Sequence, residues 1–434
     1  MRIGIDGNEA NVKNRVGTGV YTLELLKQFQ QYSSSEARSK KQSVLAGART
    51  INFEIFLKET PLADLPLETE SFTYKVFGPK KLWTQFALPI KLTIGQKPYV
   101  FFSPAHYGPR FSRVPYVVTI HDLSYLHFPE LFRKEDLVQL TNWSKYSIKN
   151  SVHIIAPSQA TKDDIVKSYN IDPSKITVIY EGYNKEVFKP QSAAKVLAVK
   201  NKYKITGDYI IFVGTLQPRK NIERLIEAFA SIVHSSSLIV NGESSPMNGK
   251  RSTISLVVVG KKGWMFDQIL TKANDLGIED RVIFTDFVPD PDLPALISGA
   301  KVYVNPSLWE GFGIPVIEAQ ACGVPVIVSN ISSLPEIVDS QHYSSSERSE
   351  SRSLLDSSRQ ARTIISDAVV SGSAVLINPQ SVQSISTGFK KLLVDDKLRK
   401  DLIEKGNENI KRFSWEKCAN DTVTLLARFA SINK

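Results

Sequence analysis

Short apolar runs, each closed by a polar or glycine-containing loop, constrain the fold of this chain most. At residues 100–102 and 116–120 the runs are unbroken, as expected for parallel strands buried on both faces. Residues 20–29 follow the first run with apolar side chains at helical spacing. Strand, turn and helix in alternation predict a doubly wound α/β fold. The runs lie at residues 2–6, 51–56, 100–102, 116–120, 154–158, 176–179, 209–215, 255–260, 282–284, 302–305, 325–329 and 374–377.

The length and composition of the chain favour two such domains. Its 434 residues exceed the ~250–300 residues at which one core stops growing, and the strand–glycine–helix opening occurs twice, at 2–29 and 209–229. Apolar content of 42% and charged content of 23% are ordinary for a globular protein. We see no signal peptide, no apolar run near ~20 residues and only two cysteines, so we expect a cytoplasmic protein.

The charge of the chain is positive and uneven. Net charge is +10; residues 1–185 hold 24 Lys and Arg against 17 Asp and Glu, and the rest holds 30 against 27. A basic excess can favour an anionic membrane, nucleic acid or phosphorylated substrates, or it can serve solubility alone. No nucleic-acid-binding signature accompanies it. We expect an aromatic-rich helix over residues 81–92, interrupted at Pro89, which either packs on the sheet or touches a membrane surface.

Residues 307–323 join two predicted strands through a glycine-rich turn and a helix. The turn is Glu310-Gly311-Phe312-Gly313, and Glu318 is expected in the first helical turn. Pro suits the start of a helix and Gly the position just past its end, as Pro315 and Gly323 do here. The N–H groups of a first helical turn attract anions.

Two cations stand in a similar position in the second domain. Gly214 closes a predicted strand, and Arg219 and Lys220 follow shortly before a helix at 222–229. A guanidinium fork and an ammonium at a helix start can hold a diphosphate, although a solvated loop would explain the charges as well.

In the first domain, Gly17 and Gly19 form a turn before the first helix. The third glycine of a dinucleotide fingerprint is missing, so the loop either faces a phosphate or merely needs glycine. His106 lies in the polar loop after one predicted strand, and the pair His121-Asp122 directly follows another. Ligands of open α/β sheets bind at the carboxyl ends of strands, so these side chains are placed to act.

The stretch 307–323 resembles the donor site of the retaining glycosyltransferases of family 4, with its two glutamates separated by seven residues. The His-Asp-Leu element at 121–123 is also similar. The resemblance implies the GT-B fold, with two facing Rossmann-like domains and a cleft between them. It covers nearly the whole chain outside expected insertions at 33–49, 235–253 and the serine-rich 340–366. We place the domains at 1–187 and 188–415, with the helix 416–434 returning to the first.

The resemblance also implies roles for single residues. Glu318 would accept the ribose hydroxyls and Glu310 would face the donor sugar. The N–H groups of residues 311–313 would face sugar hydroxyls and phosphate. Phe287 and Val288 lie in the loop that holds the nucleotide base. The glycine-rich loop at Gly17 and Gly19 is similar to the family's, although Val20 stands where Arg is usual.

For catalysis, the resemblance implies that Arg219 and Lys220 stabilise the leaving diphosphate, which itself takes the proton of the acceptor. His121 would orient the sugar. The two cations stand in place of a metal ion, so no metal and no cofactor are expected. The hexose is expected to be mannose, with GDP-mannose favoured over UDP-glucose.

The acceptor is expected to be a hydroxyl of a saccharide or lipid-linked glycan, with peripheral contact to the inner face of an anionic membrane and none with nucleic acid. Two alternatives stay open. One is a GT-B glucosyltransferase of the synthase type that uses UDP-glucose or ADP-glucose. The other is a non-catalytic protein that only binds nucleotide sugars.

Overall fold

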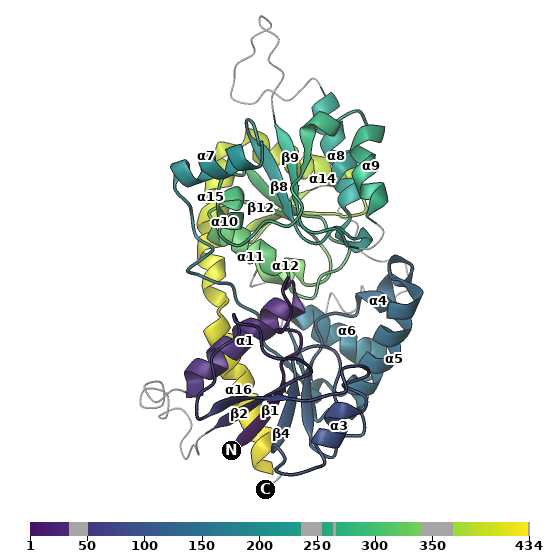
Figure 1. Ribbon diagram of the computed structural model, residues 1–434. Coiled ribbons are helices and arrows are strands. Elements are labelled where there is room, and N and C mark those ends of the chain that lie inside the picture. The colour runs from purple at the N-terminus through teal and green to yellow at the C-terminus, as the bar shows by residue number, and fades with distance from the viewer. Residues whose placement is uncertain (34–50, 236–253, 264–265, 340–367, 433–434) are drawn as a thin grey trace, which may run out of the picture. The chain divides into compact units, whose positions relative to one another are not determined.

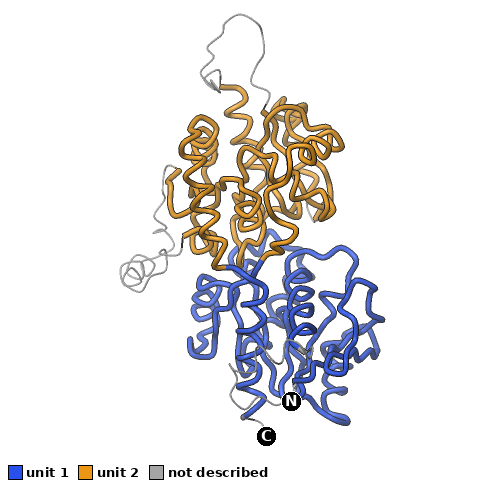
Figure 2. Tube along the Cα trace, turned by 90° about the vertical axis from the view of Figure 1, so that its left-hand side faces the viewer, with its two compact units in different colours: residues 1–182, 413–434 blue, residues 183–412 orange. Residues whose placement is uncertain are grey.

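The computed structural model describes residues 1–33, 51–235, 254–263, 266–339 and 368–432. The chain divides into two compact units, shown in blue and orange in Figure 2. Unit 1 comprises Met1–Gly182 and Phe413–Lys434, and unit 2 comprises Tyr183–Arg412. The three insertions expected at 33–49, 235–253 and 340–366 lie almost entirely outside the described residues.

Unit 1 is built on a seven-stranded parallel sheet in the order β3-β2-β1-β4-β5-β6-β7. All four residues of each of the strands β4, β5 and β6 are buried, as their unbroken apolar runs predict. The strands are β1 (Arg2–Asp6), β2 (Asn52–Leu57), β3 (Phe72–Val76), β4 (Val100–Ser103), β5 (Tyr116–Thr119), β6 (His153–Ala156) and β7 (Ile176–Val178).

Helices cover both faces of this sheet (Figure 1). On one face α1 (Thr18–Ser33) packs against α16 (Trp415–Ile432). On the other, a core of sheet residues joins α3 (Ala87–Lys91), α5 (Lys134–Asn150) and α6 (Gln159–Tyr169). Ser158 caps α6 by accepting from the N–H of Thr161, as its position predicts. The short helix α4 (Ser124–His127) precedes α5, and three-residue 3-10 turns occur at Pro129–Leu131 and Pro173–Lys175.

The helix predicted over 81–92 is wrong in extent. Residues 81–86 form turns, and only Ala87–Lys91 are helical. Leu82 adopts φ +52°, in the left-handed region, which is incompatible with a continuous right-handed helix through this position.

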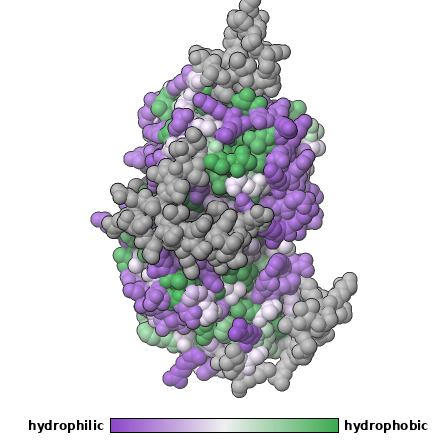
Figure 3. Space-filling view, turned by 180° about the vertical axis from the view of Figure 1, so that it is seen from behind, coloured by the Kyte–Doolittle hydropathy of each residue, from purple (hydrophilic) through white to green (hydrophobic). Residues whose placement is uncertain are grey.

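Unit 2 repeats the architecture with a seven-stranded sheet in the order β10-β9-β8-β11-β12-β14-β13, in which only β13 is antiparallel to its neighbour. The strands are β8 (Tyr209–Val213), β9 (Ser255–Val259), β10 (Val282–Phe284), β11 (Val302–Asn305), β12 (Val326–Ser329), β13 (Val369–Ser371) and β14 (Ala374–Ile377). On the face shown in Figure 3, hydrophobic residues of unit 2 gather in one area among hydrophilic ones.

The core on one face of the second sheet contains side chains of α8, α9, α14 and α15. Helix α11 packs against the strands β11 and β12, α12 packs against β12, and α10 packs against α7 and α11. The helices are α7 (Ala193–Lys202), α8 (Ile222–His234), α9 (Asp267–Asp275), α10 (Leu293–Ser298), α11 (Ile314–Ala321), α12 (Leu334–Val338), α14 (Val382–Val394) and α15 (Asp396–Asn409), with 3-10 turns at Pro218–Lys220 (η3), Glu279–Arg281 and Ile410–Arg412.

In each unit the strand order reverses at one point, between β1 and β4 in unit 1 and between β8 and β11 in unit 2. Loops that leave adjacent strands in opposite directions open a crevice at such a point, where open α/β sheets bind ligands. Gly17 and His106 follow β1 and β4, and Arg219, Lys220 and Glu310 follow β8 and β11, whereas His121 follows β5 and Phe287 follows β10. Among the helices that the structure describes, none is long and apolar enough to cross a membrane.

Candidate functional site

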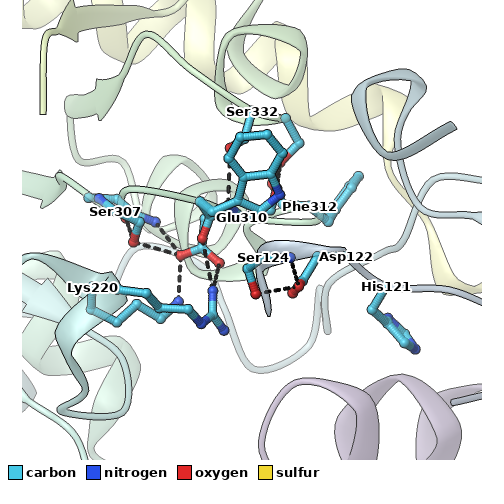
Figure 4. Close-up of polar contacts among 12 residues, drawn as sticks. His121, Asp122, Ser124, Lys220, Ser307, Glu310, Phe312 and Ser332 are labelled. Carbon is cyan, nitrogen blue, oxygen red and sulfur yellow. Dashed lines mark hydrogen bonds and ion pairs between the residues drawn. The ribbon is translucent and has the colours of Figure 1, made fainter. Parts of the chain in front are cut away.

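The loops after β8 and β11 bring a carboxylate and two cations together at the reversal point of unit 2. Glu310, in the β11 loop, is paired with Lys220, and its Oε2 lies 3.4 Å from Nη1 of Arg219. The same Nη1 donates to the Trp309 carbonyl oxygen at 2.8 Å. Figure 4 shows the Lys220 and Ser307 side chains converging on the Glu310 carboxylate. The structure therefore joins Arg219, Lys220 and Glu310, which the sequence singled out separately.

Polar neighbours fix the Glu310 carboxylate. Ser307 Oγ lies 2.8 Å from Glu310 Oε1 and 2.6 Å from Asn305 Oδ1, so its one proton has two acceptors within reach. Ser332 Oγ accepts from the Glu310 N–H at 3.0 Å, and Ser333 Oγ donates to the Glu310 carbonyl oxygen at 3.0 Å. The sequence analysis did not single out Asn305, Ser332 or Ser333 as site residues. The only local indication of them is that polar residues, Asn305 and Ser307, occur where the predicted strand β11 ends.

The charges of this cluster act on the Glu310 carboxyl in opposite directions. Burial raises its pKa, but Lys220 and then Arg219 outweigh burial, so the pKa stays below its ordinary value. The side chains of Glu310, Lys220 and Arg219 are 9%, 14% and 17% exposed, which leaves them little screening by solvent. One carboxylate and two cations leave one positive charge in excess, which favours an anion beside the cluster.

The backbone around the cluster begins two helices. Asn221 takes a left-handed conformation directly before α8, and its Nδ2 donates to the carbonyl oxygens of Pro306 at 3.0 Å and Pro379 at 2.6 Å. Gly313 precedes α11 with φ +109°, where a side chain would be strained. Pro315 and Gly323 lie at the predicted ends of α11, and Gly323 has φ +76°. Two helix N-termini thus lie at this edge of the sheet.

Glu318 lies in the second turn of α11, so its prediction for the first turn is wrong by a few residues. Burial raises the pKa of this carboxyl to about 8, and the neighbouring Asp290 contributes to the rise. The pKa values of the two glutamates are therefore shifted in opposite directions, because Glu310 has two cations beside it and Glu318 has the acidic residue Asp290 nearby.

The other predicted donor residues of unit 2 lie near the same sheet edge. Gly214 directly follows β8, and an added Cβ there would lie 3.7 Å from Cε of Lys220. Phe287 is 47% exposed in the loop after β10, whereas Val288 is buried. Gly311 and Phe312 lie in the loop before α11, and the Phe312 carbonyl accepts from Ser333 Oγ at 2.9 Å.

One Asp-x-Asp triplet, Asp290-Pro-Asp292, was overlooked in the expectation of a metal-free site. Asp292 Oδ2 lies 2.6 Å from Lys202 Nζ and accepts from Tyr203 Oη at 3.1 Å. Within the described ranges, no three His, Cys, Asp or Glu side chains form a group able to hold a metal ion.

In unit 1, His121 follows β5 and is held on both sides of its ring. Nε2 lies 2.8 Å from the Pro104 carbonyl oxygen and Nδ1 lies 3.2 Å from Glu181 Oε1. Both partners are acceptors, so the ring satisfies both contacts as hydrogen bonds only when it is an imidazolium with a proton on each nitrogen. Burial lowers the pKa of His121, but Glu181, the Pro104 carbonyl and Asp122 outweigh burial and raise it. The sequence reading missed Glu181, which is 60 residues away in the chain.

Aromatic side chains enclose this ion pair. The Tyr21 ring of α1 contacts the His121 ring edge-on, with centroids 4.8 Å apart, and also contacts Trp415 of α16. Gly182 follows Glu181, and an added Cβ there would lie 2.1 Å from the Trp415 nitrogen. Glu181 is therefore held in place by close packing against the start of α16.

His106 differs from its neighbour His121. Its ring lies 5.6 Å from the His121 ring, and its Nδ1 is buried with no partner among the described residues. Burial, and then the nearby His121, lower the pKa of His106 to about 4.

The other predicted residues of unit 1 lie in loops and at helix starts. Gly17 has φ +49° before α1, and Gly19 lies in the first turn of α1. Asp122 accepts from the N–H of Ser124 at 2.9 Å.

Comparison with known proteins identifies the family. Residues 65–187 match the family described as Glycosyltransferase Family 4, and residues 196–350 match Glycosyl transferases group 1. An O-antigen chain mannosyltransferase B of Escherichia coli is 30% identical over 331 residues, covering 75% of this chain and 74% of that protein. The chain belongs to the group 1 glycosyltransferases, family 4. The family predicted from residues 307–323 is thereby confirmed.

Solved structures confirm the GT-B fold of this glycosyltransferase. A sucrose-phosphate synthase from Thermosynechococcus elongatus superposes with a TM-score of 0.68 at 18% identity, covering 99% of both chains. The Anabaena protein HepE, solved in complex with UDP-glucose, superposes with a TM-score of 0.65 at 15% identity, covering 98% of this chain and 99% of that one. At such identities the likeness supports the fold alone.

Proposed function

We propose that this glycosyltransferase moves a hexose, mannose in the first place, from a nucleotide-diphosphate sugar to a hydroxyl of a saccharide or lipid-linked acceptor in glycan, lipopolysaccharide or glycolipid synthesis. The observation behind this proposal is the cluster of Arg219, Lys220 and Glu310 at the reversal point of the second sheet. Its excess positive charge and two helix starts suit a diphosphate.

The donor would lie along this edge of unit 2. Arg219 and Lys220 would stabilise the charge that develops on the leaving diphosphate, and such electrostatic stabilisation usually contributes most to the rate enhancement. Glu310 holds both cations before the donor arrives, so little reorganisation is needed. Glu318 would take the ribose hydroxyls; in its protonated form the carboxyl both donates and accepts a hydrogen bond. Phe287 and Val288 would meet the base, and Gly214 and residues 311–313 the sugar and phosphates.

The reaction would proceed with retention at the anomeric carbon. The bond from that carbon to the diphosphate oxygen breaks, the bond to the acceptor oxygen forms on the same face, and the acceptor proton passes to the leaving phosphate. Cations in the site would serve where other enzymes use a metal ion. His121, with both ring nitrogens engaged, would act mainly by fixing the loop after β5. Gly17 and Gly19 would let a phosphate approach α1.

Mannose is favoured by the name of the Escherichia coli relative, an O-antigen chain mannosyltransferase, and GDP-mannose is the corresponding donor. The cytoplasm is favoured by the two buried cysteines, Cys322 and Cys418, which are both free. A synthase-type enzyme for UDP-glucose or ADP-glucose, and a binder without activity, are the alternatives.

Donor hydrolysis separates these functions. We expect faster release of the nucleotide diphosphate from GDP-mannose than from UDP-glucose or ADP-glucose, with the α-anomer of mannose as the first product seen by NMR. Faster turnover of a glucose donor would support the synthase-type alternative. Binding of a donor, seen as a thermal shift without any turnover, would show a binding protein.

A further inference from the structure

One segment of unit 1 holds the whole basic excess of the first domain. Residues 71–121 contain seven Lys and Arg and no Asp or Glu, whereas the remaining residues of 1–185 contain 17 of each sign. Six of the seven cationic residues are exposed: Lys75, Lys80, Lys81, Lys91, Lys97 and Arg113. One of them, Lys80, pairs at 3.2 Å with the exposed Glu59, and no salt bridge is found for the other five among the described residues.

The same segment exposes a row of large apolar side chains. At intervals of four residues lie Leu82, Phe86, Ile90 and Ile94, which are 47%, 59%, 57% and 67% exposed. Scattered exposed apolar residues are common on proteins, but a contiguous row within a basic surface marks an interaction site.

The exposed row lies on a different side of the segment from the residues that are buried in the core. The other side of the segment already packs into the core of unit 1 through Trp83, Ala87, Leu88 and Leu92. Trp83 is 4% exposed and donates from Nε1 to the Phe77 carbonyl oxygen at 3.1 Å. The segment is thus apolar on two sides, and only one of them is used inside the unit.

A second loop extends the surface. The Arg110 N–H donates to the Thr84 carbonyl oxygen at 3.3 Å, so the loop that carries Phe111 is joined to the segment between Leu82 and Phe86. Phe111 is 78% exposed. Both Phe111, at φ +55°, and Leu82, at φ +52°, are bulky residues in the left-handed region. Such strain persists only where the surroundings or a function require it.

We propose that this surface docks unit 1 on an anionic lipid bilayer. We call it the docking surface and define it by Leu82, Phe86, Ile90, Ile94 and Phe111 with Lys81, Lys91 and Lys97. Exposed apolar side chains among lysines suit the boundary of headgroups and acyl chains, because the apolar side chains enter the bilayer while the ammonium groups meet the lipid phosphates. Charge favours this partner over a second copy of the chain, whose corresponding surface would carry the same sign.

Co-sedimentation of the full chain with vesicles tests the proposal. We expect binding to an equimolar mixture of phosphatidylcholine and phosphatidylglycerol, and much weaker binding to phosphatidylcholine alone. Binding should fall as salt rises, because the Debye length shrinks from ~10 Å at 0.1 M to ~3 Å at 1 M. Equal binding to both vesicles, or binding to neither, would overturn the proposal.

Two double variants, each with a matched control, localise the contact. K81Q/K91Q should weaken binding to the anionic vesicles by about 30-fold, at about fivefold for each lysine. F86S/I90S should weaken it by at least about 10-fold. The controls K397Q/K400Q and L197S/V394S change equally exposed residues of unit 2 and should leave binding unchanged.

A tryptophan at the surface reports insertion directly. In F86W, brominated acyl chains should quench fluorescence that the parent protein, whose nearby Trp83 is buried, does not lose. No quenching beyond that of the parent would show that the apolar row stays outside the bilayer. Light scattering tests whether a second copy of the chain covers the row instead. A dimer that F86S/I90S converts to a monomer would show that a second copy covers the row, and would overturn the membrane assignment.

Discussion

The two units place different charges at equivalent edges of the same kind of sheet. In unit 2, one carboxylate lies between two cations; in unit 1, one histidine lies between a carboxylate and a carbonyl oxygen. The first arrangement leaves positive charge in excess, and the second is balanced. A shared fold therefore decides where groups meet, and the residues of the loops decide whether the meeting point attracts an anion.

The largest expected effect is on catalysis in unit 2. We expect R219A and K220A each to lower donor turnover by about 100-fold to 1000-fold, because each removes a charge that stabilises the leaving diphosphate. Circular dichroism should show an unchanged fold. K301A removes a lysine paired with Asp208 at 3.5 Å on the surface of the same unit and should keep full turnover. Normal rates from both site variants would refute the diphosphate assignment.

The next effect concerns the stability of the same cluster. E310Q should lower the free energy of unfolding by about 3 kcal/mol at pH 7, because two largely buried cations lose their partner. The folded pKa of Glu310 lies below 4.5, so its stabilisation is present above pH 4.5 and disappears as pH falls through the folded value. Urea unfolding at pH 7 and at pH 3 should thus show a smaller difference between wild type and variant at the lower pH.

The histidine pair of unit 1 should respond to pH in the opposite sense. E181Q should lower the free energy of unfolding by about 1–2 kcal/mol at pH 6. The folded pKa of His121 is raised above 6.5, so the stabilisation is full below 6.5 and is lost as pH rises through the folded value. The deficit of E181Q should therefore shrink at pH 9. An equal deficit at both values would mean that His121 is neutral in the folded protein.

The smallest expected effect is a gain in stability. Glu318 has a folded pKa of about 8 against an ordinary 4.5, so wild type loses stability between these values as pH rises. E318Q avoids that loss and should be more stable by about 1–2 kcal/mol at pH 8, with little gain at pH 4, after allowance for its partial exposure. The same change should weaken donor binding. A variant that gains stability and binds donor normally would remove Glu318 from the proposed site.

Local patterns in the sequence predicted one part of this picture well. Pro315 and Gly323 give the ends of α11, and Ser158 gives the start of α6, because capping depends on the few residues at each helix end. The apolar runs also predict the buried central strands of both sheets. Glu310 and the pair Arg219-Lys220 could be chosen as site residues, since each follows a predicted strand.

Contacts between distant residues could not be predicted in the same way. The pairing of His121 with Glu181 depends on how β5 and the end of β7 are brought together, and nothing near either residue indicates it. The helix expected over 81–92 failed for a related reason. Some of its apolar residues pack into the core of unit 1 and others are exposed, so apolar residues occur at helical spacing without a continuous helix.

The position of α16 has a consequence for the order in which the protein folds during synthesis. Unit 1 needs residues 413–434, whose helix packs on α1 and β4, whereas unit 2 occupies the 230 residues from 183 to 412 without interruption. At roughly 5–20 residues per second, the ribosome needs about 10–50 s to pass through unit 2. During that time α1 and β4 lack their final cover. The later unit can therefore finish folding first, and the earlier one stays exposed to chaperones and proteases until residues 413–434 have been made.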